Sequence, residues 1–446
     1  MKISFLGATK TVTGSKYLVA ENNNTILVDC GLYQGTKEEE LLNYEELPVL
    51  AKDIDALILT HAHLDHCGFI PRLVKNGFCG KIYATAATIE IAKIILIDSA
   101  KIQEENSKKY TSKKNPLSKP LYTQQETVES FDLFTPVDYD KEFEILGFKV
   151  KFKRAGHILG ASSVYITGSK RVLFSGDLGR LDDPLMVSPD KISHCDLVVM
   201  ESTYGNRVHA QVDPISKLEK ILERVVAENK VLLVPSFAVA RSQLFLHYLK
   251  QVFLKREDLK IPAFVNSPMI NQVTEIYKQH SDEIKLSSDD FKNSMTSARF
   301  LEWSKEYSKL NKKKGPLIIV AASGMVSGGR ILEHLDHFGK YPNNMVLLIG
   351  YQSVGTIGHS LKNDQRDISL LGHKMNVKAE VVLLENLSAH ADQDELIHWL
   401  SSSQSLPKEV VLVHGEEEAQ VGLKKRIEEQ LNLSVYLSKE IKEIEL

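Results

Sequence analysis

The segment THAHLDHCG, residues 60–68, concentrates three histidines and an aspartate within six positions. It follows the apolar run ALIL, residues 56–59. Imidazole and carboxylate groups are the ligands that zinc and similar ions prefer in proteins. One such histidine would more often be hydrogen-bonded to the backbone of a polar loop, but an HxHxDH cluster rarely serves packing alone. The segment therefore predicts a metal site at the end of a buried strand.

The spacing of this segment allows more than one ion to bind. Residues two apart in an extended turn can face one ion, while Asp65 and His66 can turn toward a second. A dinuclear site needs more ligands than these four, and two further residues have suitable side chains. They are His157 in RAGHILGA and Asp177 in FSGDLG. Taken singly, each would more often be a capping or turn residue.

The first two hundred residues contain the strands that would position these side chains. Short runs rich in β-branched residues are bounded there by glycine and aspartate, which is typical of strands. In three runs the apolar part is followed by an aspartate or a histidine, namely Asp29, His61 and Asp177. Residues at the ends of strands lie at the edge of a sheet, where functional groups are presented. The runs are NTILVDCG (24–31), DALILTHAH (55–63), KIYAT (81–85), FKVKFKRAGH (148–157), RVLFSGDLG (171–179) and DLVVMESTYG (196–205).

From about residue 206 the pattern changes to alternating strands and helices. Asp213-Pro214 is a plausible N-cap with proline in the first helical position, and Leu218, Ile221, Leu222 and Val225 follow at helical spacing. Strand VLLVPSF, helix RSQLFLHYLKQVFL and further alternating elements come next. Such alternation predicts a largely parallel sheet covered by helices. After about residue 378 the chain returns to strand, helix, strand and helix.

The spacing of HxHxDH, His157 and Asp177 resembles that of the metallo-β-lactamase superfamily, and Asp29 in LVDCG fits its first motif. Further motifs resemble the β-CASP branch of that superfamily. This branch contains nucleases, including the endonuclease subunit of the mRNA 3′-end cleavage machinery and bacterial and archaeal RNases. The motifs are ESTYGNR (201–207), VPSFAVARSQ (234–243), AASGMVSGGR (321–330), GYQSVGTIGHSL (350–361), SAHADQ (388–393) and VHGE (413–416).

The resemblance implies an α/β fold: an αββα metallo-β-lactamase sandwich with an inserted α/β β-CASP cap domain. We expect the sandwich to comprise residues 1–205 and 378–446, and the cap to comprise residues 206–377. The active site would lie in the cleft between them, as ligand sites often do. Access through such a cleft favours single-stranded RNA over a duplex.

The resemblance also implies the ligands of two Zn²⁺ ions. His61, His63 and His157 would hold one zinc ion, while Asp65, His66 and His414 would hold the second. Asp177 would bridge the two ions, and Asp29 would support the histidines from behind. Asp65, Glu201 and His390 are the residues implied in catalysis.

Two zinc ions about 3.5–4 Å apart can share a hydroxide at neutral pH and neutralise charge on a phosphoryl oxygen. His390, oriented by Glu201, could donate a proton to the leaving oxygen. The resemblance implies products with 3′-hydroxyl and 5′-phosphate ends.

The motif AASGMVSGGR is the candidate phosphate cradle. Small residues between a strand and a helix let backbone amides approach an anion, although many such turns serve packing alone. The candidate substrate contacts are Ser327, Gly328, Gly329, Arg330 and Arg241, the two arginines as clamps on the RNA backbone.

Several other functions compete with an endoribonuclease. RNA-directed members of the family have histidine at the VHGE position where DNA-directed members have valine, so His414 favours RNA over DNA. The large inserted domain argues against a small-molecule hydrolase, and the complete set of ligand positions argues against a non-catalytic scaffold subunit. The chain starts at its first strand and ends soon after its last, which favours an endonuclease over a 5′-exoribonuclease.

Composition describes an ordinary globular protein. The 446 residues are 43% hydrophobic and 25% charged with a formal net charge of −3, so a polyanion would have to be held by a local site. No apolar run reaches 18 residues, which predicts no membrane span. The four cysteines form no CxxC pair and the N-terminus does not resemble a signal peptide, which favours reduced thiols and a cytoplasmic protein. A homodimer or an RNA-processing complex would both be compatible with the sequence.

Overall fold

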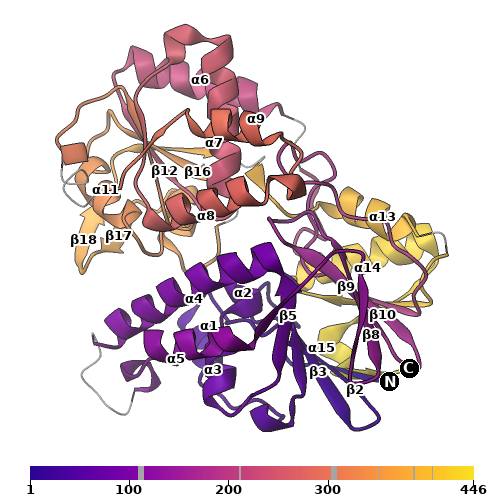
Figure 1. The fold of residues 1–446 in the computed structure, drawn as a ribbon. Helices are drawn as coiled ribbons and strands as arrows, with labels where there is room; N and C mark the ends of the chain where they lie inside the picture. The colour runs from indigo at the N-terminus through magenta and orange to yellow at the C-terminus, as the bar shows by residue number, and fades with distance from the viewer. Residues whose placement is uncertain (109–114, 210–211, 303–308, 351, 385–386, 404) are drawn as a thin grey trace. The chain divides into compact units, whose positions relative to one another are not determined.

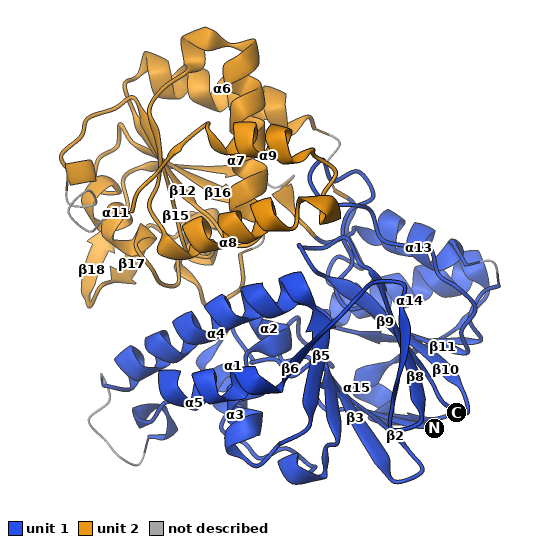
Figure 2. Ribbon diagram, in the orientation of Figure 1, with its two compact units in different colours: residues 1–208, 390–446 blue, residues 209–389 orange. Residues whose placement is uncertain are grey.

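The chain divides into two compact units in the computed structural model, which describes residues 1–108, 115–209, 212–302, 309–350, 352–384, 387–403 and 405–446 (Figure 1). Unit 1 comprises Met1–Val208 and His390–Leu446, and unit 2 comprises His209–Ala389 (Figure 2). Unit 2 is therefore an insertion in the sequence of unit 1. This arrangement confirms the predicted fold class, a sandwich built from both ends of the chain with an inserted α/β domain.

The first sheet of unit 1 has seven strands in the order β22-β1-β2-β3-β4-β5-β6. Strands β3, β4, β5 and β6 run parallel to one another, so their carboxyl ends share one edge of the sheet. The strands are β1 Lys2–Phe5, β2 Tyr17–Glu21, β3 Asn24–Val28, β4 Ala56–Ile58, β5 Lys81–Thr85, β6 Phe134–Val137 and β22 Glu443–Glu445.

The second sheet of unit 1 also has seven strands, in the order β21-β20-β11-β10-β9-β8-β7. Strands β10, β11, β20 and β21 are parallel, so chain segments from both ends of the sequence finish at the same edge. The strands are β7 Glu142–Ile145, β8 Phe148–Arg154, β9 Ser162–Thr167, β10 Arg171–Phe174, β11 Leu197–Glu201, β20 Glu409–Val413 and β21 Ser434–Leu437. All six runs predicted as strands in this unit are strands in the structure.

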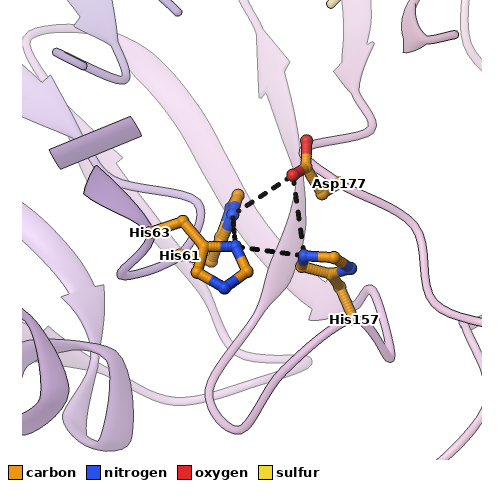
Figure 3. A group of neighbouring side chains, drawn as sticks. All are labelled: His61, His63, His157 and Asp177. Atoms are coloured by element: carbon orange, nitrogen blue, oxygen red, sulfur yellow. Dashed lines mark hydrogen bonds and ion pairs between the residues drawn. The ribbon is translucent and has the colours of Figure 1, made fainter. Parts of the chain in front are cut away.

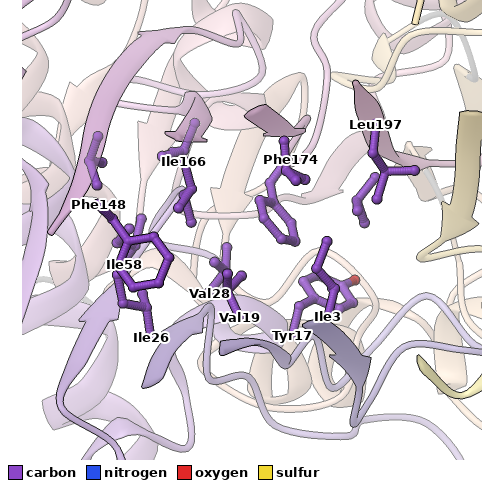
Figure 4. Close-up of a cluster of buried hydrophobic side chains, with 14 of the residues drawn as sticks. Ile3, Tyr17, Val19, Ile26, Val28, Ile58, Phe148, Ile166, Phe174 and Leu197 are labelled. Carbon is purple, nitrogen blue, oxygen red and sulfur yellow. The ribbon is translucent and has the colours of Figure 1, made fainter. Parts of the chain in front are cut away.

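The core of unit 1 lies between these two sheets (Figure 4). Val19, Ile26 and Ile58 from the first sheet pack with Phe148 and Ile166 from the second, and all five are buried. Their alternation along each strand follows from the period of two residues in a strand, which sends every second side chain to the same face. Removing this apolar surface from water is what holds the sandwich together.

Helices cover the outer faces of the sandwich. Helix α4 contacts β5 and β6 of the first sheet, while α14 contacts β20 and β21 of the second, which gives the αββα layering. Among the described helices, none combines the length and the apolar character needed to cross a membrane. The helices are α1 Lys37–Leu42, α2 Leu64–Cys67, α3 Ile70–Lys75, α4 Ala86–Ser107, α5 Gln124–Ser130, α13 Gln393–Ser401, α14 Glu417–Leu431 and α15 Ser438–Ile441.

Unit 2 is built on a six-stranded sheet in the order β14-β13-β15-β12-β16-β19, in which every neighbouring pair is parallel. This confirms the parallel sheet predicted from the alternating pattern. A separate hairpin pairs β17 Asp367–Leu370 with β18 His373–Asn376. The sheet strands are β12 Val231–Pro235, β13 Ala263–Val265, β14 Arg299–Phe300, β15 Leu317–Ala321, β16 Met345–Ile349 and β19 Glu380–Leu384.

The two helices of unit 2 that were located from the sequence, α6 and α7, begin close to their predicted positions. Asp213 caps α6 by accepting hydrogen bonds from the N–H groups of Ile215 and Ser216, with Pro214 in the first helical turn. The boundary predicted after residue 377 differs from the structure, because β19 pairs with β16 and so belongs to unit 2. The helices are α6 Pro214–Ala227, α7 Arg241–Lys255, α8 Pro268–Gln279, α9 Ser288–Met295, α11 Ile331–Phe338 and α12 Ile357–Lys362.

Candidate metal centre

Three imidazole rings and one carboxylate converge at the sheet edges of unit 1 (Figure 3). His63 Nδ1 lies 3.1 Å from both His61 Nε2 and His157 Nε2, and Asp177 Oδ2 lies 3.4 and 3.6 Å from these two Nε2 atoms. Nitrogen ligands about 2.0–2.1 Å from one tetrahedral zinc lie roughly 3.3 Å from one another. The spacing of the three nitrogens therefore suits one such ion.

A second group lies on the other side of Asp177. His414 Nε2 is 3.2 Å from Asp65 Oδ2, and His66 Nε2 is 4.0 Å from the same oxygen. Asp65 and His66 belong to the short helix α2, whereas His414 directly follows β20 near the other end of the sequence. The ligand atoms of these three residues lie within 4.8 Å of one another, so they could hold a second ion.

Asp177 faces both groups with different oxygen atoms. Its Oδ2 atom faces His61 and His157, while its Oδ1 atom lies 3.2 Å from His66 Nε2 and 3.6 Å from His414 Nδ1. The residue is 1% exposed, and neither oxygen has a hydrogen-bond donor among the described residues. A buried carboxylate without donors is costly in free energy, and cations on both sides would compensate for it. The residues present therefore fit a pair of metal ions.

The electrostatics prepare these side chains to bind cations. Burial lowers the pKa of His61, of His157 and of His63, the last to about 3, so these rings are neutral at pH 7 and offer lone pairs. Burial alone would raise the pKa of Asp177, but His414 and the other surrounding imidazoles outweigh it and hold that pKa well below its usual value. His61, His63 and His157 are therefore neutral donors beside a negative carboxylate, the donor set of a metal site. At His66 and His414 burial lowers the pKa, but nearby carboxylates, chiefly Asp177, outweigh it and raise the pKa, so these two rings would release a proton when an ion binds.

Asp29 supports the second group from behind. It follows β3 with a positive φ of 58°, and it is fully buried. Its Oδ1 accepts the N–H of Thr60 at 2.8 Å, while its Oδ2 accepts the Thr60 hydroxyl and lies 2.7 Å from His66 Nδ1. An ionised carboxylate can only accept, so His66 carries a proton on Nδ1, which leaves Nε2, 3.2 Å from Asp177 Oδ1, as the nitrogen that would face a metal ion.

Comparisons with known proteins agree with this architecture. Residues 11–219 match the metallo-beta-lactamase superfamily, residues 242–361 match the Beta-Casp domain, and residues 374–438 match the Zn-dependent metallo-hydrolase RNA specificity domain. The chain is 34% identical to Ribonuclease TTHA0252 of Thermus thermophilus, with 95% of each chain covered. The chain belongs to the β-CASP family of the metallo-β-lactamase superfamily. Members of this superfamily bind divalent metal ions, which the histidine and aspartate groups of unit 1 are able to hold.

More distant relatives extend over the same length of this β-CASP protein. Transcription termination factor FttA of Methanosarcina mazei is 29% identical over 97% of this chain and 70% of its own. A solved structure described as a protein of unknown function from Enterococcus faecalis V583 is 15% identical, with a TM-score of 0.54 over 100% of this chain and 99% of its own. At that identity the likeness concerns the fold alone.

Two residues indicated by the family resemblance alone, Glu201 and His390, lie beside the two groups of candidate metal ligands in this β-CASP protein. Glu201 ends β11 and is 1% exposed; its Oε1 accepts the N–H of Leu178 at 2.6 Å and lies 3.3 Å from His390 Nδ1. The His390 side chain is 15% exposed, and its ring centroid is 4.3 Å from that of His157. The carboxylate is thus enclosed, and the imidazole is the member of the pair that reaches the surface.

The predicted substrate residues lie in unit 2, at the carboxyl edge of its sheet. Ser327, Gly328, Gly329 and Arg330 form the turn between β15 and α11, and a side chain at Gly328 would meet no atom within 4 Å. Arg330 Nη1 donates to Asn266 Oδ1 at 2.8 Å. Arg241 begins α7 after the neighbouring strand β12 and is 7% exposed. The turn is therefore open to an anion at Gly328, while Arg241 is mostly covered.

Two hydroxyl groups that position candidate ligands were missed by the sequence analysis. Thr60 is bonded to both oxygens of Asp29, and its Oγ1 lies 3.1 Å from His61 Nδ1. Thr203 Oγ1 lies 3.1 Å from His414 Nδ1. Both threonines lie inside motifs that the sequence analysis singled out: Thr60 directly precedes His61 in THAHLDHCG, and Thr203 lies in ESTYGNR. This position in the motifs was the signal that could have identified them.

Proposed function

We propose that this protein is a zinc-dependent ribonuclease that hydrolyses phosphodiester bonds within single-stranded RNA and leaves 3′-hydroxyl and 5′-phosphate ends. Its relatives support a nuclease that acts on RNA: one is named a ribonuclease and another a transcription termination factor, and residues 374–438 match an RNA specificity domain. The residues proposed for the chemical step are Asp65, which is also a proposed metal ligand, His390, and Glu201, which would act through His390.

The observation that carries this proposal is the placement of Asp177. One buried carboxylate presents one oxygen to each imidazole group, and neither oxygen has a hydrogen-bond donor among the described residues. This arrangement supports two ions rather than one. His61, His63 and His157 would hold the first, Asp65, His66 and His414 would hold the second, and Asp177 would bridge them. When bound, two zinc ions would supply an acidified water and neutralise the charge on a phosphoryl oxygen.

The side chains of the site would do the rest of the chemistry. In hydrolysis, the oxygen of water forms the new bond to phosphorus, and the bond from phosphorus to O3′ breaks. His390 is positioned to give the departing O3′ a proton, because it reaches the surface beside His157. Glu201 is buried behind it and would hold its ring in place rather than touch the substrate. In unit 2, the open turn at Gly328 would bind a phosphate of the RNA backbone.

Cleavage of 5′-labelled single-stranded RNA and matched DNA by the zinc-loaded protein would test the proposal. The variants His63→Ala and His390→Ala remove a proposed ligand and the proposed proton donor. His194→Ala is the matched control, because His194 is exposed and bonds Ser405 away from the metal groups. We expect internal RNA fragments with 3′-hydroxyl ends, lost in the first two variants and kept in the control, and we expect zinc content to fall only in His63→Ala.

Other products would identify the competing functions. Labelled mononucleotide alone would indicate a 5′-exoribonuclease, and faster cleavage of DNA would indicate a DNA nuclease of the same family. If zinc binds and neither polymer is cut, the catalytic proposal is wrong and a scaffold role replaces it.

A further inference from the structure

A short loop next to the metal groups, residues 202–207, is held rigidly in unit 1. At its start, Ser202 donates its N–H to the carbonyl of His414 and its hydroxyl to the carbonyl of Val413. At its end, the N–H of Gln393 donates to the carbonyl of Arg207 at 2.9 Å. A side chain at Gly205 would come within 2.4 Å of the Ala419 carbonyl in α14, so the loop lies directly against that helix.

This anchored loop, which we call the Tyr204 loop, presents an aromatic ring and a cation. The ring centroid of Tyr204 lies 6.1 Å from that of His390, at an interplanar angle of 58°. The guanidinium carbon of Arg207 lies 5.8 Å from the Tyr204 ring centroid. Tyr204 is partly exposed and Arg207 is exposed, and no carboxylate of the described chain lies within ion-pair distance of Arg207.

An aromatic ring together with an arginine is the combination that binds a nucleotide of a single strand. Bases stack on aromatic side chains whatever their sequence, while arginine stacks on rings and bonds phosphate oxygens. The residues mentioned earlier as substrate contacts all lie in unit 2, so unit 1 would otherwise hold only the reacting phosphate. The Tyr204 loop adds a second type of contact directly beside the proposed proton donor.

We propose that Tyr204 and Arg207 form the binding subsite for the nucleotide immediately 5′ of the scissile phosphate, with its base stacked on Tyr204 and Arg207 near the adjoining 5′ phosphate. This inference rests on the proposed function, because the role of His390 as proton donor decides which nucleotide lies next to Tyr204. His390 would protonate the O3′ of the nucleotide 5′ of the scissile phosphate. Tyr204 is the ring of the loop that lies beside His390. Tyr204 is therefore a substrate-positioning residue.

A purely structural role for Tyr204, as a support for the His390 ring, makes a different prediction. A support would matter equally for every substrate, whereas a stacking ring matters only where a base is present. Substrates that lack one base therefore separate the two roles. Tyr204→Phe keeps an aromatic face and serves as the conservative variant, while Tyr204→Leu keeps apolar volume without one.

The test uses zinc-loaded full-length protein and an RNA oligonucleotide with one mapped cleavage site. One substrate has an abasic residue immediately 5′ of that site, and a control substrate has it three nucleotides to the 3′ side. For the unaltered protein we expect the first abasic residue to lower kcat/KM about 5- to 100-fold. Tyr204→Leu should lose a similar factor on intact RNA and then be insensitive to the missing base, and Tyr204→Phe should behave like the unaltered protein.

Two further readouts strengthen the comparison. Arg207→Gln should weaken RNA binding and flatten its salt dependence, with a slope of log K against log salt smaller by about 0.7. In the cleavage-deficient His390→Ala protein, 2-aminopurine placed 5′ of the site should be quenched on binding, and the quenching should be lost when Tyr204→Leu is added.

Distinct results would overturn the inference. If Tyr204→Leu lowers cleavage of intact and abasic RNA by the same factor, Tyr204 only supports His390. If the unaltered protein cleaves RNA but responds equally to both abasic positions, the subsite is not where we propose, although the proposed function stands. If the unaltered protein cleaves no RNA, both the inference and the proposed function are wrong.

Discussion

At the scale of single residues, the orientation of each imidazole decides whether a metal site exists. Asp29 controls His66 in this way, because its carboxylate accepts from Nδ1 at 2.7 Å and leaves Nε2 for the metal side. Such carboxylate–histidine contacts raise the basicity of the ligand and fix its ring. The metal affinity of the second group should therefore depend on a residue that touches no metal.

Asp29→Asn should lower zinc affinity at the second group by about 10- to 100-fold, because the amide is neutral and can turn its NH₂ toward Nδ1. Asparagine tolerates the positive φ of 58° at this position, so the backbone should be unchanged. Equilibrium dialysis with a zinc indicator would measure the loss: one of the two zinc ions should bind more weakly and the other with unchanged affinity. Asp55→Asn is the matched control, since the Asp55 carboxylate accepts the N–H of Thr25 at the other end of β4 from the histidines. Equal affinity in both variants would contradict the role of Asp29.

The residues of HxHxDH could be predicted to come together because they lie within six positions at one strand end, and the structure does bring them together with His157, Asp177 and His414. Their roles as ligands stay predictions. The place of Thr60 beside His61 was a signal in the sequence, but its contact with Asp29 could not be predicted, because that contact joins the ends of two strands and depends on sheet pairing. The burial of Glu201 was hidden for the same reason, since its donor, Leu178, follows a different strand.

At the scale of elements, helix α2 is held in place by the turn that follows β3. The N–H of Ser15 donates to the Asp65 carbonyl, and the N–H of Gly31 donates to the Ser15 carbonyl. A Cβ atom at Gly31 would lie 1.6 Å from the Asp65 carbonyl oxygen. Glycine is needed here for close approach, because any side chain would push α2 and its two candidate ligands away from β3.

Gly31→Ala should therefore cost both stability and metal binding. We expect a loss of about 1–3 kcal/mol in the free energy of unfolding, as for other overpacked sites, and weaker binding at the second group. Urea unfolding and zinc titration would measure the two effects. Gly147→Ala is the control: Gly147 has a φ of +86° and open space around its Cβ position, so it should cost about 1–2 kcal/mol of backbone strain with zinc binding unchanged. If both variants bind zinc normally, Gly31 does not position α2.

Strand β2 begins next to an unusual buried cation. Lys16 is 2% exposed; its Nζ donates to the carbonyl of Gly31 at 2.5 Å and lies over the rings of Tyr33 and Phe69. Burial lowers the pKa of Lys16 from 10.5 to about 8. Between these two pH values the unfolded chain binds more protons than the folded chain at this residue, so folding becomes more favourable as pH rises.

The contribution of Lys16 should thus increase the free energy of unfolding by an amount on the order of 3 kcal/mol between about pH 8 and 10.5, since a tenfold change in proton affinity is worth about 1.4 kcal/mol. Lys16→Met removes the titrating group and keeps most of the volume. Urea unfolding of both proteins at several pH values would give the difference directly. We expect the stability of Lys16→Met relative to the unaltered protein to fall as pH rises through this range. A difference that does not change with pH would contradict the lowered pKa.

Elements with strong local signals were predicted well, and those whose place depends on pairing were not. Asp213-Pro214 and the apolar stripe after it identify α6 without reference to any other element. The run EVVLL of β19 also reads clearly as a strand, yet its apolar residues would suit either sheet edge. Only its pairing with β16 assigns it to unit 2, which is why the two compact units divide after Ala389, whereas the sequence predicted a boundary after residue 377.

At the scale of the whole molecule, the candidate metal centre joins distant parts of the sequence within unit 1. His61 and Asp177 come from the segment before unit 2, and His414 comes from the segment after it. A ligand that binds only the folded chain stabilises it by mass action. Bound metal should therefore stabilise unit 1 by linking its two chain segments, whereas the described residues of unit 2 contribute none of these candidate ligands.

Hydrogen exchange followed by mass spectrometry, with zinc and after chelation, would test this coupling in the full chain. At a free zinc concentration one hundred times the dissociation constant, the stabilisation is about 2.7 kcal/mol, which slows globally exchanging amides about 100-fold. We expect this slowing in peptides from β4, β10 and β20 and little change in β12 and β15 of unit 2. In His414→Ala the slowing by zinc should fall to the value given by one ion bound at His61, His63 and His157. Equal slowing in both units would mean that they unfold together, and no slowing in either would mean that the histidine groups do not bind zinc.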